Sequence, residues 1–295
     1  MKKSLLVLIA TVVAISSCKK AEDKKDDNDN TNNNTVDPCT MVISSSEGPS
    51  AGDLFILGTD NTFNDSTLFK KTGTAQTWDF SVLVSSKEDT FNFQSTTGTS
   101  LGTLFPSANM IISAQGLDLA AIKSTAGISI IATELPPIIN NISITPAFTD
   151  PAIFIPYPLQ KDGSFSDTYS AGVTMPYDTV VFSVVHIDSI RATLTGSNSF
   201  SVDGCGKITT PTGTYDCVKY LLNPGTLVEK YEGHVVGSGW VDFTVMVKGL
   251  SGFKTPEFPL INSKSYVWVS KDKKFPVCMI TVDASGNATS VQYLK

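Results

Sequence analysis

The chain has 295 residues, with 28 acidic side chains against 22 basic ones and a formal net charge of −6. This acidic balance argues against a nucleic-acid partner and against attraction to an anionic lipid surface, because both are negatively charged. Val, Ile, Thr, Phe and Tyr are abundant, and few stretches repeat apolar residues at helical spacing. The composition therefore predicts an all-β protein, long enough for one large domain or two small ones.

Residues 1–17 have the pattern of a secretory signal peptide. Lys2 and Lys3 form a basic start, an apolar run covers 5–15, and small residues then lead to Cys18. The run is shorter than the ~20 apolar residues that a membrane-spanning helix needs. A cleaved signal is therefore the better interpretation.

The end of this segment, ISSC at 15–18, resembles the lipobox of bacterial lipoproteins. In such proteins, signal peptidase II cuts before a cysteine that already carries a diacylglyceryl thioether. The resemblance implies that Cys18 becomes the first residue of the mature protein and that its acyl chains anchor the protein durably in a membrane. The alternative is an ordinary secretory signal followed by a chance cysteine.

Residues 18–37 are predicted to form the lipidated cysteine and a disordered tether. The tether is rich in Lys, Asp and Asn and has almost no apolar residue, so it cannot bury enough surface to offset the cost of ordering. Its start, KKAED at 19–23, resembles the export signal of Bacteroidota surface lipoproteins. That resemblance implies a location in the outer membrane, exposed at the cell surface rather than held on the periplasmic leaflet.

The remaining chain is predicted to form antiparallel sheet, either a β-sandwich or a curved meander. Residues 38–160 form an N-terminal β region of short strands, in which 117–124 could instead make a short helix. Residues 161–295 form a C-terminal antiparallel β meander of longer strands. Turns are expected there at Gly196, Pro211, Gly225, Gly237, Pro256, 271–274 and Gly286. A domain boundary is placed near Lys161, after a proline-rich connection, although one continuous sheet could also pass through it.

Three stretches resemble motifs of a group of secreted, β-rich Bacteroidota proteins of unknown function. They are GTAQTWDFS at 73–81, LFPSAN at 104–109 and VDGCGKITTPTGTYD at 202–216. The resemblance covers most of the chain from 45 to 225. In the first motif Trp78 alternates with Asp79 on a strand, which predicts a ring that points into the core. A tryptophan that stacks on a bound sugar is the functional alternative.

Four cysteines remain if Cys18 carries lipid, and an oxidising location would allow them to pair. They are Cys39, Cys205, Cys217 and Cys278. A disulfide between Cys205 and Cys217 is the first possibility, because these two flank a predicted turn. A three-residue loop at 211–213 would place Cys217 opposite Lys207 and leave Cys205 on the diagonal, ~7 Å away, so free buried thiols are equally expected.

The sequence offers few groups for catalysis. The nucleophile-elbow pattern GxSxG occurs at 48–52 and 98–102, but neither serine is expected to precede a helix as an elbow requires. The only histidines are His186 and His234. Each shares a strand face with a carboxylate, and two ligands do not make a metal site. We therefore predict no catalytic, cofactor-binding or metal-binding residue.

Taken together, the sequence predicts a lipid-anchored surface protein whose β body is a non-catalytic binding or structural module. Its partner would be a glycan or another surface protein. Two alternatives stay open. One is a half-barrel that carries a lipid or another hydrophobic ligand. The other is a glycan-cleaving enzyme built on two carboxylates ~5 to 9.5 Å apart.

Overall fold

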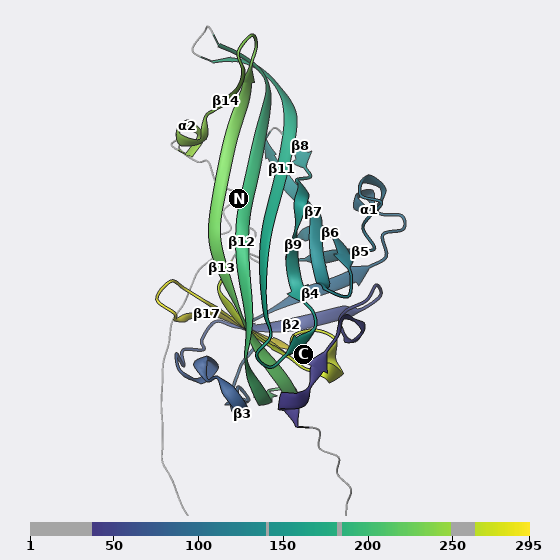
Figure 1. Cartoon of the computed structure of the whole chain (residues 1–295), viewed down its shortest axis with the longest axis vertical. Coiled ribbons are helices and arrows are strands. Elements are labelled where there is room, and N and C mark those ends of the chain that lie inside the picture. Colours follow the sequence, from purple (N-terminus) through teal and green to yellow (C-terminus); the bar gives the residue numbers. More distant parts are fainter. Residues whose placement is uncertain (1–36, 140–141, 182–184, 249–262) are drawn as a thin grey trace, which may run out of the picture.

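The computed structural model describes residues 37–139, 142–181, 185–248 and 263–295 (Figure 1). The predicted signal peptide, Cys18 and the tether up to residue 36 lie outside these ranges. Most elements of the described residues are strands, which confirms the all-β prediction. Within the same ranges, no helix combines the length and the apolar character needed to cross a membrane.

Twelve antiparallel strands form a closed barrel. The ring runs through neighbouring strands from β13 to β12, and the pairing of β12 with β13 closes it. In ring order the strands are β13 (Gly213–Val235), β15 (Ser265–Val269), β16 (Cys278–Val282), β17 (Ala288–Leu294), β2 (Leu54–Asp60), β4 (Lys87–Gln94), β5 (Met110–Ala114), β6 (Leu117–Lys123), β7 (Gly127–Ile139), β9 (Ala147–Pro156), β11 (Ser164–Val181) and β12 (Val185–Thr210).

Shorter elements are attached to this ring. The remaining strands are β3 (Gly73–Asp79), parallel to β12, β14 (Gly239–Asp242), beside β13, β8 (Ile142–Ile144), beside β7, and the separate pair β1 (Val42–Ile43) and β10 (Leu159–Gln160). The helices are η1 (Pro38–Thr40), η2 (Ser45–Glu47), η3 (Leu68–Lys70), α1 (Ser100–Leu104), α2 (Thr244–Lys248) and η4 (Lys271–Lys273). The stretch 117–124 is thus strand β6 over 117–123, and its alternative interpretation as a helix is wrong.

Three strands, β11, β12 and β13, are much longer than the others and rise above the barrel as an upright wall (Figure 1). We call their upper parts, 170–181, 185–197 and 223–235, the upper wall. The sequence favours such length because β-branched and small residues continue through it with few breaks. Strand β12 pairs with β13 from the upper wall down to the turn at Pro211, with three shifts of register along the way.

Two of the seven expected turns do not exist, and the one expected at Pro256 lies outside the described residues. Gly196 and Gly225 lie inside β12 and β13, although the expected turns at Pro211 and Gly237 are present. A β-carbon at Gly196 would lie 2.2 Å from Cζ of the Tyr169 ring, so glycine is required there by a close approach and not by a turn. The register of β12 against β13 shifts beside it, between Gly196 and Asn198. A glycine in a strand often marks such a bulge or close approach.

The sheet passes through the predicted boundary at Lys161. Strand β9 pairs with β11 across it, and β2 pairs with the last strand, β17. Side chains from both predicted regions share one hydrophobic cluster. Within the described residues, the two regions therefore form one sheet around one main core.

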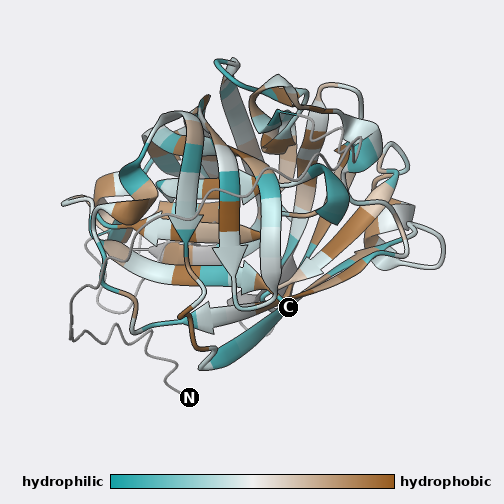
Figure 2. Ribbon diagram, turned by 90° about the horizontal axis from the view of Figure 1, so that it is seen from below, coloured by the Kyte–Doolittle hydropathy of each residue, from teal (hydrophilic) through white to brown (hydrophobic). Residues whose placement is uncertain are grey.

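The core lies in the lower part of the barrel and is dominated by aromatic rings. Figure 2 shows hydrophobic and hydrophilic residues succeeding each other along the strands around the ring, as expected when one face of each strand is buried. Seven of the rings in this core are together called the aromatic core: Phe55, Trp78, Phe80, Phe91, Phe93, Trp268 and Phe275. The ring of Trp268 meets those of Trp78 and Phe80 edge to face, at centroid distances of 5.8 and 5.3 Å. Such pairs contribute about 0.5–1.5 kcal/mol each beyond the burial of their surface.

Candidate functional site

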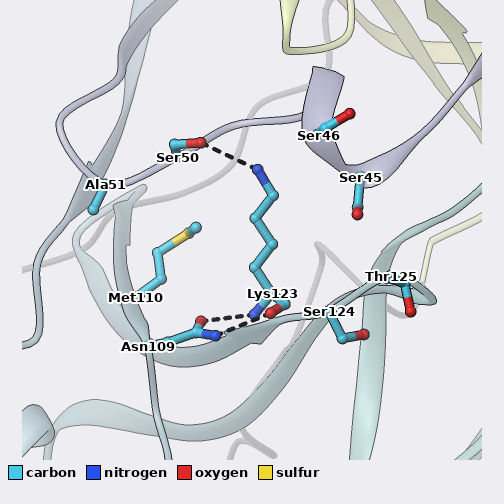
Figure 3. Close-up of a pocket in the computed structure, with 9 residues that line it drawn as sticks. All are labelled: Ser45, Ser46, Ser50, Ala51, Asn109, Met110, Lys123, Ser124 and Thr125. Carbon is cyan, nitrogen blue, oxygen red and sulfur yellow. Dashed lines mark hydrogen bonds between the residues drawn. The ribbon is translucent and has the colours of Figure 1, made fainter.

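A surface pocket of about 530 Å³, lined mostly by Ser, Thr, Asn and Lys residues, lies where three chain segments meet (Figure 3). The segments are the loop from η2 to β2, the start of β5, and the turn between β6 and β7. We call it the serine pocket, and the residues that line it are Ser45, Ser46, Ser50, Ala51, Asn109, Met110, Lys123, Ser124 and Thr125. Its size is typical of small-ligand sites, which measure roughly 300–1,000 Å³.

Lys123, at the end of β6, crosses the serine pocket and holds its first segment in place. Its Nζ donates hydrogen bonds to the carbonyl oxygens of Gly48 and Pro49, at 3.0 and 2.7 Å, and to Oγ of Ser50 at 3.1 Å. Three acceptors match the three hydrogens of an ammonium group. Burial nevertheless lowers the pKa of Lys123. The positive charge of Lys123 is therefore engaged by these three protein oxygens.

Asn109 fixes the main chain on which Lys123 sits. Its amide nitrogen donates to the carbonyl oxygen of Lys123 at 2.9 Å, and its amide oxygen accepts from the backbone nitrogen of Lys123 at 2.8 Å. Both polar atoms of the amide are therefore bound to β6. This pairing orients the lysine side chain toward the loop, as Figure 3 shows.

The close approach of the loop to the barrel depends on Gly48. A β-carbon there would lie 2.0 Å from Oη of Tyr157, a buried side chain of the core. Two ion pairs hold the same loop from its other side, Glu47 with Lys271 at 2.8 Å and Asp53 with Lys274 at 2.9 Å. The pocket wall is therefore built on a fixed loop.

Ser45 and Thr125 supply the uncommitted polar groups of the serine pocket. Neither hydroxyl has a hydrogen-bond partner within the part of the chain that the structure describes. Ser46, in contrast, shares a hydrogen bond with Ser44 at 2.8 Å, and Ser124 donates weakly to Gly127 at 3.3 Å. A free hydroxyl can both donate and accept, so the pocket presents neutral hydrogen-bonding groups beside an ammonium group that protein oxygens already engage.

The serine pocket lacks the parts of an acyl-transfer site. Ser50 belongs to the first GxSxG match, yet it precedes strand β2 and not a helix. Its hydroxyl accepts from Lys123, whose ammonium hydrogens are all engaged, and its backbone nitrogen donates to Asp53 at 2.8 Å. An ammonium without a lone pair cannot accept the serine proton as a general base.

The second GxSxG match differs from the prediction in one respect. Ser100 is the first residue of the five-residue helix α1, so the expectation that no helix follows it was wrong. A turn at 97–98 precedes it, where the elbow requires a strand. Thr99, and not Ser100, caps the helix by accepting from the backbone nitrogen of Gly102 at 3.0 Å. The match therefore marks a helix start.

Trp78 does not offer a stacking surface. Its side chain is 0% exposed and meets Trp268 inside the aromatic core. The prediction that its ring points into the core is confirmed, and the alternative of a sugar-stacking Trp78 is wrong for this conformation. Strand alternation places the ring inward while Asp79 faces solvent.

The predicted disulfide between Cys205 and Cys217 is wrong. Cys205 is bonded to Cys39, with an S–S distance of 2.02 Å, and Cys217 and Cys278 are buried free thiols. The turn between β12 and β13 has two residues, so Cys205 lies opposite Val218 and Cys217 opposite Gly206. Neighbouring positions on a strand point to opposite faces, which separates the two thiols.

Both histidines lie on the upper wall, each beside one aspartate. His186 is 2.6 Å from Asp178, and His234 is 2.9 Å from Asp188. The aspartate that contacts each histidine thus lies on a neighbouring strand, whereas the sequence pointed to carboxylates on the same strand, Asp188 for His186 and Glu232 for His234. Among the described residues, no group of three His, Cys, Asp or Glu side chains is placed to hold a metal ion.

The glycan-cleaving alternative needs two carboxylates near each other, and Asp150 on β9 and Asp167 on β11 are such neighbours. Burial, and then the charge of Asp150, raise the pKa of Asp167. However, Asp167 accepts from the backbone nitrogen of Ile153 at 2.8 Å and Asp150 accepts from Thr168 at 3.0 Å, so each stabilises the strand pairing. Neither lines the serine pocket, which contains no carboxylate.

Sequence reasoning missed the serine pocket because its residues are far apart in the chain and of ordinary type. The one signal was the GxSxG match around Ser50, interpreted as a coincidence. For comparison with known proteins, no family model, no curated protein and no solved structure matches this chain.

Proposed function

We propose that this protein is a lipid-anchored surface protein whose barrel binds a glycan in the serine pocket without cleaving it. The observation that carries the proposal is the combination of the uncommitted hydroxyls of Ser45 and Thr125 with a single charged lining side chain, Lys123, whose ammonium group is hydrogen-bonded to three protein oxygens. Sugars are neutral and rich in hydroxyl groups, so they match a pocket that offers hydroxyl donors and acceptors.

The proposed location rests on the sequence. The basic start, the apolar run and the ISSC stretch support lipidation at Cys18, and the polar segment 18–37 supports a tether that lifts the barrel from the outer membrane. A Cys18→Ala variant should leave the membrane fraction, and protease added to intact cells should reach the barrel of the wild type. Retention of Cys18→Ala in the membrane would contradict lipid anchoring.

The binding proposal is tested with the purified full chain on a glycan array, followed by titration of any glycan that binds. Removing both free hydroxyls, with Ser45→Ala and Thr125→Val together, should weaken binding by roughly tenfold or more, since each lost hydrogen bond costs about 0.5–1.5 kcal/mol. The matched control replaces two exposed hydroxyls outside the pocket, Thr226→Val with Ser285→Ala, and should bind as the wild type does.

The other outcomes separate the alternatives. Hydrolysis of a bound glycan would favour the carboxylate enzyme, and a lipid that co-purifies in native mass spectrometry would favour the carrier. Equal binding by the two double variants would remove the serine pocket from the proposal. Failure to bind any glycan would leave another surface protein as the partner to be sought by cross-linking on intact cells.

A further inference from the structure

Lys219 is a fully buried lysine in the lower part of β13. Its side chain is 0% exposed, and its Nζ donates to the carbonyl oxygens of Phe69 and Lys71, at 3.2 and 2.6 Å. The rings of Tyr266 and Trp78 lie beside it, with centroids 5.2 and 5.9 Å from Nζ. The amine is therefore held at a fixed point in an aromatic, largely dry environment.

Asp203 faces this amine from the neighbouring strand. It lies in the bulge of β12, where the register against β13 shifts between Val202 and Gly204. Its Oδ1 lies 3.1 Å from Nζ of Lys219. This oxygen is buried and accepts no hydrogen bond of ordinary geometry from the described residues. A bulge commonly redirects a side chain, and here it turns a carboxyl group onto a buried amine.

Both groups are shifted toward their neutral forms. Burial lowers the pKa of Lys219, while burial raises the pKa of Asp203, against the opposing effect of each partner's charge. A neutral amine is a nucleophile and a neutral carboxylic acid can lose hydroxide as water, so the shifts favour the species that react. The 3.1 Å between Nζ and Oδ1 places the amine directly beside the carboxyl group whose carbon it would attack, so little movement is needed to bring the reacting atoms together.

We propose that Lys219 and Asp203 join in an intramolecular amide bond between β13 and β12. The ammonium first passes one proton to the carboxylate, which gives an amine and a carboxylic acid. Nζ then forms a bond to Cγ of Asp203, the bond from Cγ to the hydroxyl oxygen breaks, and that hydroxyl leaves with one amine proton as water. One amide and one water replace the two groups, and no oxidant or other reactant is needed.

The position of the bond gives it a mechanical consequence. Cys205, two residues after Asp203 on β12, is already linked to Cys39 at the start of the described chain. An amide at Asp203 would extend this covalent path from Cys39 through β12 to β13. Tension that reaches the barrel through its N-terminal segment would then pass to the central strands through covalent bonds, without separating β-strands.

A second lysine–aspartate pair on the same two strands provides an internal control. Lys207 on β12 lies 2.7 Å from Asp216 on β13, closer than the buried pair, but the two side chains are 59% and 43% exposed. Water stabilises both charges there, so the ammonium has no free electron pair. Proximity alone would link this pair as well, whereas a mechanism that needs burial leaves it unlinked.

The test is a tryptic map of the full-length folded protein after reduction and alkylation. Cleavage after Lys219 should fail, and peptide 208–230 should appear joined to peptide 192–207, lighter than their sum by one water. The exposed pair should give no linked product. Recovery of 192–207, 208–219 and 220–230 as linear peptides in full yield would overturn the proposal.

A second measurement tests the proposal even if a variant fails to fold. Protein collected from inclusion bodies and kept in denaturant should give only linear peptides, and refolding should produce the branched one. Asp203→Ala should restore cleavage after Lys219 in whatever material is obtained. A branched peptide in the never-folded sample, or one that survives Asp203→Ala, would show that another group or artefact forms the link and would contradict the assignment.

Discussion

The lower barrel and the upper wall are built from the same strands, β11 to β13, yet they are stabilised in different ways. In the lower barrel these strands close a ring around the aromatic core, and Trp78, Phe80 and Trp268 are fully buried. In the upper wall most side chains are half-buried or exposed, and Val180 and Val228 expose more than half of their surface. Charged and polar pairs across the strands accompany this exposure, including Arg191 with Glu232. Closure of the sheet, more than strand length, therefore determines where apolar burial is concentrated.

The strongest test of this comparison removes one tryptophan from the lower barrel and one that packs against the upper wall. Trp268→Ala should destabilise the protein by about 3–5 kcal/mol, as expected for a buried ring whose cavity cannot collapse. Trp240 on β14 is 37% exposed and packs on Arg191, with the guanidinium carbon 4.3 Å from the ring centroid. Trp240→Ala should cost about 1 kcal/mol or less. Urea unfolding followed by circular dichroism measures both, and equal losses would contradict the difference between the regions.

The disulfide gives the next largest effect, because it fastens the first described segment to the lower barrel. Cys39 and Cys205 are 166 residues apart in sequence, so the bond restricts a long loop in the unfolded chain. The paired change Cys39→Ser with Cys205→Ser should cost about 2–4 kcal/mol. Thermal unfolding of the variant and the wild type tests the cost.

Chemical labelling checks the pairing itself. In denaturant without reductant, an alkylating reagent should modify Cys217 and Cys278 but neither partner of the disulfide. Peptide mapping then identifies the labelled residues. A linked peptide that contains Cys205 and Cys217 would contradict the structure and restore the pairing first expected from sequence.

Local sequence patterns predicted the strands, but they could not predict that the strands close into a ring. Alternation placed Trp78 in the core, and the turn at Pro211 is present, because both depend on residues near in sequence. Closure depends on pairs such as β2 with β17, which join opposite ends of the chain. No local pattern encodes that contact, and it is this pairing that joins the two predicted β regions into one sheet.

The errors also follow from contacts distant in sequence. Gly196 was expected to mark a turn, but it provides space for the ring of Tyr169 on the neighbouring strand. The partner of Cys205 was sought on the adjacent strand, although Cys39 reaches it from the other end of the chain. The serine pocket likewise depends on Lys123 holding a loop more than 70 positions earlier. Signals of this kind appear only when the segments are placed in space.

The smallest expected effect concerns the charged pairs of the upper wall and depends on pH. Hydrogen bonds from Arg191, and then from Lys230, lower the pKa of Glu232 from 4.5 to about 2. Its folded pKa lies below its unfolded one, so its stabilisation is complete above about pH 4.5 and is lost as the pH falls toward 2. Glu232→Gln should therefore cost about 1–2 kcal/mol at pH 7 and much less near pH 2, because charged hydrogen bonds are the stronger ones.

The measurement is the urea-unfolding free energy of wild type and Glu232→Gln at several pH values between 7 and 2. The matched control is Glu88→Gln, since Glu88 makes an exposed ion pair with Lys295 at the lower barrel and should change stability little at any pH. A difference between wild type and Glu232→Gln that stays constant with pH would show that the carboxylate charge is not what holds Arg191. The upper wall would then depend on packing, as the lower barrel does, and the contrast between the two regions would be one of degree.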